Sequence, residues 1–416
     1  MDYFTYIKGE LHAEGVPVSD VAREAGTPVF IYSGGSFASS LTGLRDAFGV
    51  TPVLVCYSVK AASNLALLKK VADLGMGADI VSGGELYRAL RAGIPASRVV
   101  FSGVGKTGRE MAEALDAGIM MFNLESLAEM ELLARVASER GRTAPVSLRV
   151  NPDVDPGTHP YVATGLRESK FGIPWGEARE AARLALSMPS LSLVGLDCHI
   201  GSQLTSAVPF SDAVAKLSGL VSDLRSSGAS VRYLDVGGGL GITYHDESPP
   251  SPTEYAAAVT GAAGGIGGVT LVLEPGRSAV GNSCVMLARV LYIKRTPART
   301  FVIVDAAMND LVRPSLYGAY HGIRPVSEPS GGAPLSRVSV VGPVCESGDF
   351  LARDRELPPL ASGDLIAVFG AGAYGFSMSS NYNSRPRAAE VLAEGSSWRT
   401  VRARESYEDL ARGESL

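Results

Sequence analysis

The sequence predicts an α/β protein, built as a (β/α)8 TIM-type barrel plus a C-terminal, largely antiparallel β domain. Eight short apolar runs alternate with segments of helical periodicity between about residues 36 and 276, and such runs are typical of parallel strands covered on both faces. After residue 276 the rhythm changes to β-rich runs separated by Gly and Pro, as in an antiparallel domain. Eight regular repeats favour a closed barrel over an open doubly wound sheet, which is the alternative.

The predicted barrel, residues 36–276, begins with a helix over 36–48. Its strands are expected at 52–57, 77–81, 98–102, 118–122, 145–150, 193–198, 231–236 and 270–274. Two helices start from recognisable caps: Asn64 precedes an apolar stripe, and Thr107 stands three residues before Glu110, the spacing of a capping box. Further helices are expected over 83–93, 125–140, 176–187, 208–227 and 253–263.

The β domain is expected over residues 277–416, with strands at 284–294, 300–305, 337–341, 364–369, 388–393 and 398–403. Residues 1–35 are expected to form an N-terminal segment that pairs with the β domain through the run 28–32. The stretch 324–336, rich in Pro, Ser and Gly, indicates a surface loop. Residues 151–175 form a long connection inside the barrel, and such loops usually help to build the site.

The composition gives no indication of a nucleic-acid-binding, membrane-spanning or secreted protein. The 416 residues carry a net charge of −5 without a run of Lys and Arg, which gives no electrostatic reason to expect nucleic acid or an anionic membrane as a partner. No apolar stretch reaches membrane-spanning length, and the start of the chain lacks the basic and apolar regions of a signal peptide. The four cysteines form no C-x-x-C pair, which indicates reduced thiols in a cytoplasmic protein.

Chemically active residue types stand where the predicted strands end. Lys60 follows the first strand, Asp79 lies in the second, His199 follows the sixth, the glycine run 237–241 follows the seventh, and Glu274 ends the eighth. Because barrel enzymes place their chemistry at the C-terminal ends of the strands, we expect these residues to share one face.

Three of these residues have both a chemical and a structural interpretation. An ammonium at the tip of a buried strand has a lowered pKa and attacks aldehydes, but Lys60 could also simply reach solvent, as most strand-end lysines do. His199 could stack on an aromatic cofactor ring or be a satisfied core histidine. The buried carboxylate of Glu274 needs a cation, either a protonated pyridine nitrogen or Arg277 in a salt bridge. Arg277 could instead hold a carboxylate or phosphate.

Loop segments add further candidates. The run 237–241 would let backbone amides approach an anion, although a tight turn explains the glycines equally well. Cys345 beside Glu346 suits an acid–base site, or it is an incidental thiol in a solvated loop. Tyr374 lies in the glycine-rich run 370–375, where it could present its hydroxyl to a phosphate or belong to a hairpin turn.

Other kinds of site are excluded by spacing. The glycine run 237–241 does not fit the G-x-G-x-x-G pattern of a dinucleotide site. The run 103–107 lacks the spacing of a P-loop, because Val100 stands where the first glycine belongs. Five histidines without a ligand pattern predict no metal site.

The motifs follow one another in the order of a known family. They are Lys60 with its strand, the runs 77–86, 149–154, 199–203, 274–277, 313–317 and 345–349, and the shorter segments 159–161, 164–165 and 170–173. Over essentially the whole chain, this pattern resembles the fold-type III pyridoxal-phosphate-dependent decarboxylases, and within them the branch that acts on diaminopimelate. The lysine motif of the family usually has alanine and asparagine where this chain has Ser58 and Ala62.

The resemblance implies a role for each site residue. Lys60 would bind pyridoxal phosphate covalently as a Schiff base, His199 would stack on its ring, and Glu274 would keep its pyridine nitrogen protonated. The remaining cofactor-binding residues are Asp79, Ser202, Gly238, Gly239, Pro275, Gly276, Arg277 and Tyr374. The substrate would be held by Arg277, Arg313, Tyr317, Glu346 and Tyr374, with Cys345 as the proton donor.

The reaction implied by the resemblance is decarboxylation of meso-2,6-diaminopimelate at its D-centre to L-lysine and CO2, the last step of lysine biosynthesis. The implied active unit is a homodimer in which Cys345 and Glu346 come from the other subunit, acting on a small-molecule substrate. Three alternatives remain open. They are a same-fold decarboxylase of ornithine, arginine or a carrier-bound amino acid, a non-catalytic pyridoxal-phosphate-binding protein, and a regulatory relative that has lost activity.

Overall fold

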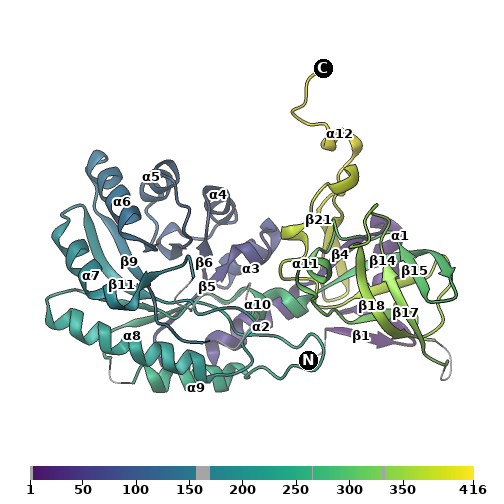
Figure 1. The fold of residues 1–416 in the computed structure, drawn as a ribbon, viewed down its shortest axis with the longest axis horizontal. Helices are drawn as coiled ribbons and strands as arrows, with labels where there is room; N and C mark the ends of the chain where they lie inside the picture. The colour runs from purple at the N-terminus through teal and green to yellow at the C-terminus, as the bar shows by residue number, and fades with distance from the viewer. Residues whose placement is uncertain (1–2, 156–168, 265, 330–332) are drawn as a thin grey trace. The chain divides into compact units, whose positions relative to one another are not determined.

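The computed structural model describes residues 3–155, 169–264, 266–329 and 333–416 (Figure 1). The chain forms two compact units. The barrel unit comprises Ser40–Ile242 and Ser248–Ser278, and the β unit comprises Met1–Ser39, Thr243–Glu247 and Ala279–Leu416. Two helices, α2 (Gly34–Asp46) and α10 (Arg277–Val280), span the boundaries between these segments.

The barrel unit contains the closed parallel sheet that the sequence predicts. Its strands are β5 (Val53–Ser58), β6 (Gly77–Ile80), β7 (Val99–Phe101), β8 (Met121–Leu124), β9 (Ala144–Asn151), β11 (Leu191–Asp197), β12 (Tyr233–Asp235) and β13 (Thr270–Leu273). Each pairs with the next in parallel, and the pairing of β13 with β5 closes the ring. A short strand, β10 (Ile173–Pro174), adds to β9 within the long connection 151–175. The expected barrel is confirmed, and the open sheet is wrong.

Helices alternate with these strands around the barrel (Figure 1). They are α3 (Leu65–Asp73), α4 (Gly83–Arg91), α5 (Gly108–Ala117), α6 (Leu127–Glu139), α7 (Ala178–Ser187), α8 (Val208–Ser226) and α9 (Pro252–Ala262), with the short turns η1 (Val59–Ala61), η2 (Ala96–Arg98) and η4 (Trp175–Glu177). The predicted caps form: the Asn64 side chain accepts from the Ala66 amide, and Thr107 with Glu110 makes a complete capping box. These side chains satisfy amides that the first helical turn leaves without partners.

The largest difference from the expected strand boundaries lies at the fourth barrel strand. The fourth barrel strand begins at Met121 rather than at 118, because Gly118 ends α5 in the left-handed conformation with φ 74°. Glycine adopts that conformation without steric cost, which makes it a common helix terminator. The barrel interior contains an apolar cluster drawn from five strands, formed by Cys56, Val100, Met121, Val194 and Val272.

The β unit is a mixed but mainly antiparallel sheet centred on β14 (Cys284–Arg295). This strand pairs antiparallel with β15 (Thr300–Val304), β19 (Leu365–Val368) and β4 (Val29–Ser33). The other strands are β16 (Ile323–Pro325), β17 (Ser336–Val341), β18 (Phe350–Leu357), β20 (Ala389–Glu394) and β21 (Ser397–Arg402). Two pairs are parallel, β4 with β20 and β15 with β17. Short helical segments are α11 (Arg313–Tyr317), α12 (Tyr407–Leu410), η5 (Gly281–Ser283), η6 (Phe376–Met378) and η7 (Tyr382–Ser384).

Sequence patterns missed several elements of the β unit. The strands β1 (Phe4–Ile7), β2 (Glu10–Ala13) and β3 (Val16–Pro17) form a separate antiparallel sheet, followed by α1 (Val18–Ala25). Strands of two to four residues are too short to show a period. The strand β18 was missed because it carries four charged residues, as edge strands often do. The stretch 324–336 is not all loop, because it starts within β16, which pairs with β19.

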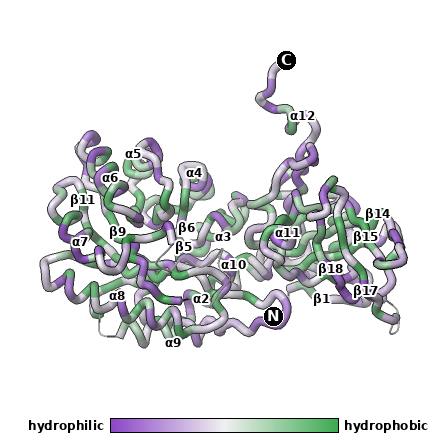
Figure 2. The backbone as a smooth tube through the Cα atoms, in the orientation of Figure 1, coloured by the Kyte–Doolittle hydropathy of each residue, from purple (hydrophilic) through white to green (hydrophobic). Residues whose placement is uncertain are grey.

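Hydrophobic residues follow the strands of each unit, whereas the barrel helices carry hydrophilic stretches (Figure 2). In the β unit, one core cluster joins the small N-terminal sheet to the main sheet, with Phe4, Leu11, Val29, Val285 and Val391 among its members. Among the described residues, we find no helix with the combined length and apolarity needed to cross a membrane.

Candidate active site

Lys60 lies at the carboxyl end of the first barrel strand, in η1 directly after β5. Its Nζ donates to Oδ2 of Asp79 over 2.7 Å, and the Asp79 side chain is fully buried whereas that of Lys60 is 33% exposed. The Ser58 hydroxyl lies 2.8 Å from the same carboxylate oxygen. The structure therefore brings together two of the predicted site residues, an accessible amine and a buried carboxylate that fixes its position.

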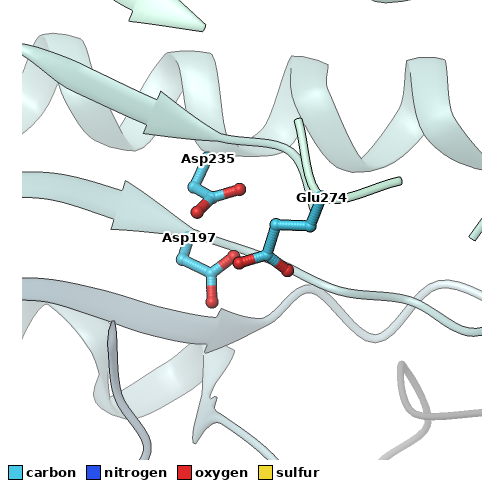
Figure 3. Close-up of side chains that lie close together, drawn as sticks. All are labelled: Asp197, Asp235 and Glu274. Atoms are coloured by element: carbon cyan, nitrogen blue, oxygen red, sulfur yellow. The ribbon is translucent and has the colours of Figure 1, made fainter. Parts of the chain in front are cut away.

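Three buried carboxylates meet at the ends of neighbouring strands. Asp197 ends β11, Asp235 ends β12, and Glu274 directly follows β13. Their side chains point toward one another, with an oxygen of each within 4.8 Å of the others (Figure 3). Burial, and then repulsion from Asp79, raises the pKa of Glu274 to about 7. Burial and the charge of Glu274 raise the pKa values of Asp197 and Asp235 well above their usual range.

Mostly neutral donors surround this carboxylate trio. Nδ2 of Asn123 lies 3.2 Å from Oδ2 of Asp235 and 3.5 Å from Oε1 of Glu274. The Ser102 hydroxyl donates to the same Glu274 oxygen over 3.2 Å. The nearby cation Arg149 is bonded more closely to Glu125, at 2.6 Å, than to Asp197, at 3.8 Å. The trio therefore lacks full charge compensation, and such a site favours a bound proton or a cationic group.

His199 lies beside the glycine run. Its Nδ1 accepts a hydrogen bond from the Gly238 amide at 3.1 Å, so the proton of the neutral ring is on Nε2. Desolvation, with the charges of Arg149 and Lys60, lowers the pKa of His199 well below 6.5. The imidazole therefore stays neutral at physiological pH, as a ring that stacks on a flat cofactor should be.

Two glycines of the run 237–241 have no room for a side chain. A Cβ atom on Gly238 would lie 2.2 Å from the carbonyl oxygen of Glu274, and one on Gly239 would lie 2.4 Å from that of Gly201. Gly239 also has φ +112°, which L-residues rarely adopt. The backbone can pass this close to the strand ends only because these residues are glycines.

We expect Gly238→Ala to lower the free energy of unfolding by about 1–3 kcal/mol, because the new methyl group forces the backbone of Glu274 to move. Thermal unfolding would measure the loss. Gly219→Ala is the matched control, since Gly219 lies exposed in α8 with nothing within 4 Å of an added Cβ. That variant should gain about 0.5–1 kcal/mol. Equal melting temperatures for Gly238→Ala and the wild type would show that the run tolerates side chains.

A hydroxyl and a guanidinium lie together next to the glycine run. Nε and Nη2 of Arg277 are 3.2 and 3.0 Å from the Ser202 hydroxyl, and Arg277 is buried. Arg277 directly follows Pro275 and Gly276, and the Leu204 amide donates to the Gly239 carbonyl. This combination of donors suits an anion such as a phosphate.

The remaining predicted residues lie in the β unit. Arg313 is buried in α11, 3.1 Å from Nε2 of His321, and Tyr317 ends the same helix. Cys345 and Glu346 are exposed in the loop between β17 and β18. Tyr374 adopts a left-handed conformation with φ 57°. The predicted residues thus fall into two groups, one in each unit, and a single site built from both groups stays a prediction.

Sequence patterns did not identify the residues that support the site. These are Ser102, Asn123, Arg149, Asp197 and Asp235. The three charged ones carried a usable signal, because each lies in a strand whose neighbours are buried and apolar, and such charges need partners. No comparable signal marks Ser102 or Asn123. Of the motifs that carried the family resemblance, residues 159–161 and 164–165 lie outside the described part of the chain.

The donor set fits pyridoxal phosphate. The cofactor's aldehyde matches the amine of Lys60, and its phosphate matches Ser202, Arg277 and the glycine run. A protonated ring nitrogen would compensate the carboxylate trio, in which Oδ1 of Asp197 has no hydrogen-bond partner among the described residues. Three carboxylates at this spacing could also bind a metal ion. Burial raises the pKa values of all three carboxyl groups, so either form of positive charge would stabilise their ionised forms.

Comparison with known proteins agrees with this chemistry. Residues 35–281 match the family model described as the pyridoxal binding domain of pyridoxal-dependent decarboxylases. The chain is 53% identical to diaminopimelate decarboxylase of Pseudomonas aeruginosa, with 100% of this chain and 99% of the relative covered. The structure of diaminopimelate decarboxylase from Helicobacter pylori complexed with L-lysine matches with a TM-score of 0.92 at 42% identity, covering 95% and 98% of the two chains. The enzyme from M. jannaschii in complex with L-lysine matches with a TM-score of 0.93 at 37% identity, covering 100% and 98%.

Proposed function

Because this chain belongs to the diaminopimelate decarboxylase family of pyridoxal-dependent decarboxylases, we propose that it converts meso-2,6-diaminopimelate to L-lysine and CO2 at the D-centre. The observation that carries the proposal is similarity over the full length of both chains at 53% identity. The site adds chemical support, since an amine, a carboxylate trio and an anion-binding group lie at one end of the barrel. The cofactor is pyridoxal phosphate.

Each group at the barrel end has a defined task in this reaction. When bound, pyridoxal phosphate supplies an electron sink for the electron pair that departing CO2 leaves behind. Lys60 provides the amine that holds the cofactor, and Asp79 keeps that amine in place. Glu274 holds a proton at the ring nitrogen, supported by Ser102 and Asn123. Preorganised charge of this kind is a large source of rate enhancement.

The β unit supplies the groups that select the substrate and complete the reaction. Arg313 and Tyr317 would bind the distal carboxylate, with Arg277 from the barrel, and Glu346 would bind the distal ammonium. Cys345 would return a proton to the reacting carbon. A second amino-acid head therefore distinguishes diaminopimelate from substrates with one amino-acid head, such as ornithine.

CO2 release with added pyridoxal phosphate tests the proposal. We would compare meso-diaminopimelate with L-ornithine, L-arginine and L-lysine. Release from meso-diaminopimelate alone, with lysine formed, supports the proposed reaction. Release from another amino acid would mean that the chain has the substrate specificity of a related decarboxylase. Ser58 and Ala62 would then be the first positions to test. No release from any of them would leave a modified or carrier-bound substrate as the next candidate.

We further propose that the enzyme is a homodimer with shared sites. Cys345 and Glu346 would come from one subunit and Lys60 from the other, in the cytoplasm, where the exposed thiol stays reduced. We expect mixtures of inactive Lys60→Ala and Cys345→Ala chains to regain activity under exchange conditions. At most about one quarter of wild-type activity should return, because only heterodimers with one intact site contribute. No recovery after proven exchange would mean that each subunit keeps its own site.

A further inference from the structure

The loop that carries Cys345 and Glu346 is anchored at its base. Asp349 accepts hydrogen bonds from the Met308 and Val344 amides at 2.7 Å each. The Ser315 hydroxyl donates to the Gly348 carbonyl at 2.6 Å. These contacts fix the two ends of the loop but do not reach the Cys345 backbone or the Glu346 carboxylate.

Two neighbouring residues of η7 hold those functional groups. Oδ1 of Asn383 accepts from the Cys345 amide at 3.0 Å, and the Tyr382 hydroxyl donates to Oε2 of Glu346 at 3.1 Å. This carboxylate raises the pKa of the Tyr382 hydroxyl, mainly through the hydrogen bond. Tyr382 therefore remains a donor at neutral pH.

The segment around η7 is held in an uncommon conformation. Asn383 and Ser384 are consecutive non-glycine residues with φ of 57° and 52°. Left-handed residues cost free energy unless their surroundings enforce them. On one side, the Asn381 side chain bonds to Glu405 at 2.6 Å; on the other, Nε of Arg385 bonds to Asn309 at 3.1 Å. These contacts enforce the turn that directs the side-chain oxygen of Asn383 toward the backbone amide of Cys345.

We propose that Tyr382 and Asn383 are positioning residues that fix the Glu346 carboxylate and the Cys345 backbone for use in the active site. This inference rests on the proposed function of Cys345 and Glu346. Hydrogen bonds between exposed groups contribute little to stability, because water competes for the same atoms. Since Cys345, Glu346 and Tyr382 are exposed, a role in positioning explains the contacts better than a role in folding.

Alkylation of Cys345 gives a readout that is independent of catalysis. Cys345 is the exposed thiol, whereas Cys56, Cys198 and Cys284 are buried, so iodoacetamide should modify Cys345 selectively in the native holoenzyme. The rate would be followed by mass spectrometry of the peptide that contains it. In the same preparations we would measure kcat and KM for meso-diaminopimelate and the melting temperature.

Asn383→Gly tests the amide contact without disturbing the turn, because glycine tolerates φ 57°. We expect about a tenfold lower kcat and a several-fold faster alkylation of Cys345, since the loop backbone loses its support. The melting temperature should stay within about 2 °C of wild type. Asn383→Asp keeps the acceptor and should return both rates toward wild type. Ser384→Gly, which changes the neighbouring left-handed residue, is the control and should leave both rates unchanged.

Tyr382→Phe tests the carboxylate contact. It should raise KM for diaminopimelate about three- to tenfold with a smaller change in kcat, because Glu346 would bind the substrate ammonium less well. Tyr292→Phe, at an exposed tyrosine of β14, is the control. Unchanged alkylation and kinetics in both Tyr382→Phe and Asn383→Gly would overturn the inference. If the wild type fails to decarboxylate diaminopimelate while Asn383→Gly still speeds alkylation, the proposed substrate is wrong and the positioning contact stands.

Discussion

Replacing Lys60 with alanine should abolish turnover and the visible absorbance of covalently bound cofactor. The amine of Lys60 lies just after the end of β5. Its Nζ donates to the buried carboxylate of Asp79 over 2.7 Å, and this contact fixes its position. Alanine has no nucleophile to bond the cofactor's aldehyde. Lys60→Arg is the more informative second variant at this position, because it keeps the positive charge near Asp79 but lacks a reactive amine. Both should be inactive, and the arginine variant should retain more stability.

Borohydride reduction gives a readout for Lys60 that does not depend on activity. In the wild type, reduction should fix pyridoxal phosphate on the peptide that contains Lys60, and in both variants that mass shift should disappear. Lys69→Ala is the control, since Lys69 is an exposed residue of α3 paired with Asp73, and it should behave as wild type. Normal turnover in Lys60→Ala, or a fixed cofactor on a different peptide, would contradict the assignment of the lysine.

The barrel could be predicted because its determinants are local and repeated. Each strand is a short apolar run, and each connection contains a helical period, so errors at one boundary do not change the topology. Gly118 shows the size of such errors: it ends α5 and moves the start of the next strand by three residues. The small N-terminal sheet could not be predicted, because its strands of two to four residues are stabilised by packing against residues more than two hundred positions away, such as Val285.

The candidate site likewise contains residues that could be identified from the local sequence and residues that could not. Lys60 and Glu274 could be identified because a charged residue at the end of an apolar strand is unusual in itself. Asn123 could not, because its importance comes from the position of β8 in the closed barrel, where its amide reaches Asp235, 112 residues away in sequence. Ser58 illustrates the intermediate case. The resemblance to the family motif marks it as a departure, and the structure gives its hydroxyl a partner, Asp79.

Glu274→Gln should have opposite effects on catalysis and on stability. Glutamine has no negative charge to hold a proton on the ring nitrogen, so the decarboxylation rate should fall by about two to three orders of magnitude while the cofactor still binds. In the cofactor-free protein, the same substitution removes a carboxylate whose negative charge is disfavoured by burial and by the nearby Asp79. Removing that penalty should raise the free energy of unfolding at neutral and alkaline pH.

The sign and the pH range follow from the raised pKa of Glu274, about 7. In the unfolded chain a glutamate titrates near 4.3, so between roughly pH 4.5 and 7 the folded state holds a proton that the unfolded state has released. The stability that this extra proton on Glu274 gives the folded state is fully present at low pH and is lost as pH rises through that window. Glutamine remains neutral throughout and does not lose it. The stability advantage of Glu274→Gln should therefore be small at pH 5 and reach roughly 2–3 kcal/mol at pH 8.

Urea unfolding of the cofactor-free proteins at pH 5 and pH 8 would measure this difference. Glu254→Gln is the matched control, because Glu254 is an exposed capping-box residue of α9 whose hydrogen bonds to Ser251 lower its pKa. That variant should show no stability gain at pH 8. The Glu274→Gln protein could prove no more stable than wild type at pH 8 and still show the expected fall in decarboxylation rate. That result would mean that the trio accommodates three charges without cost. In that case the slow catalysis would have to come from the lost contact with the cofactor alone, and the carboxylate trio would have no role in setting the proton affinity of the site.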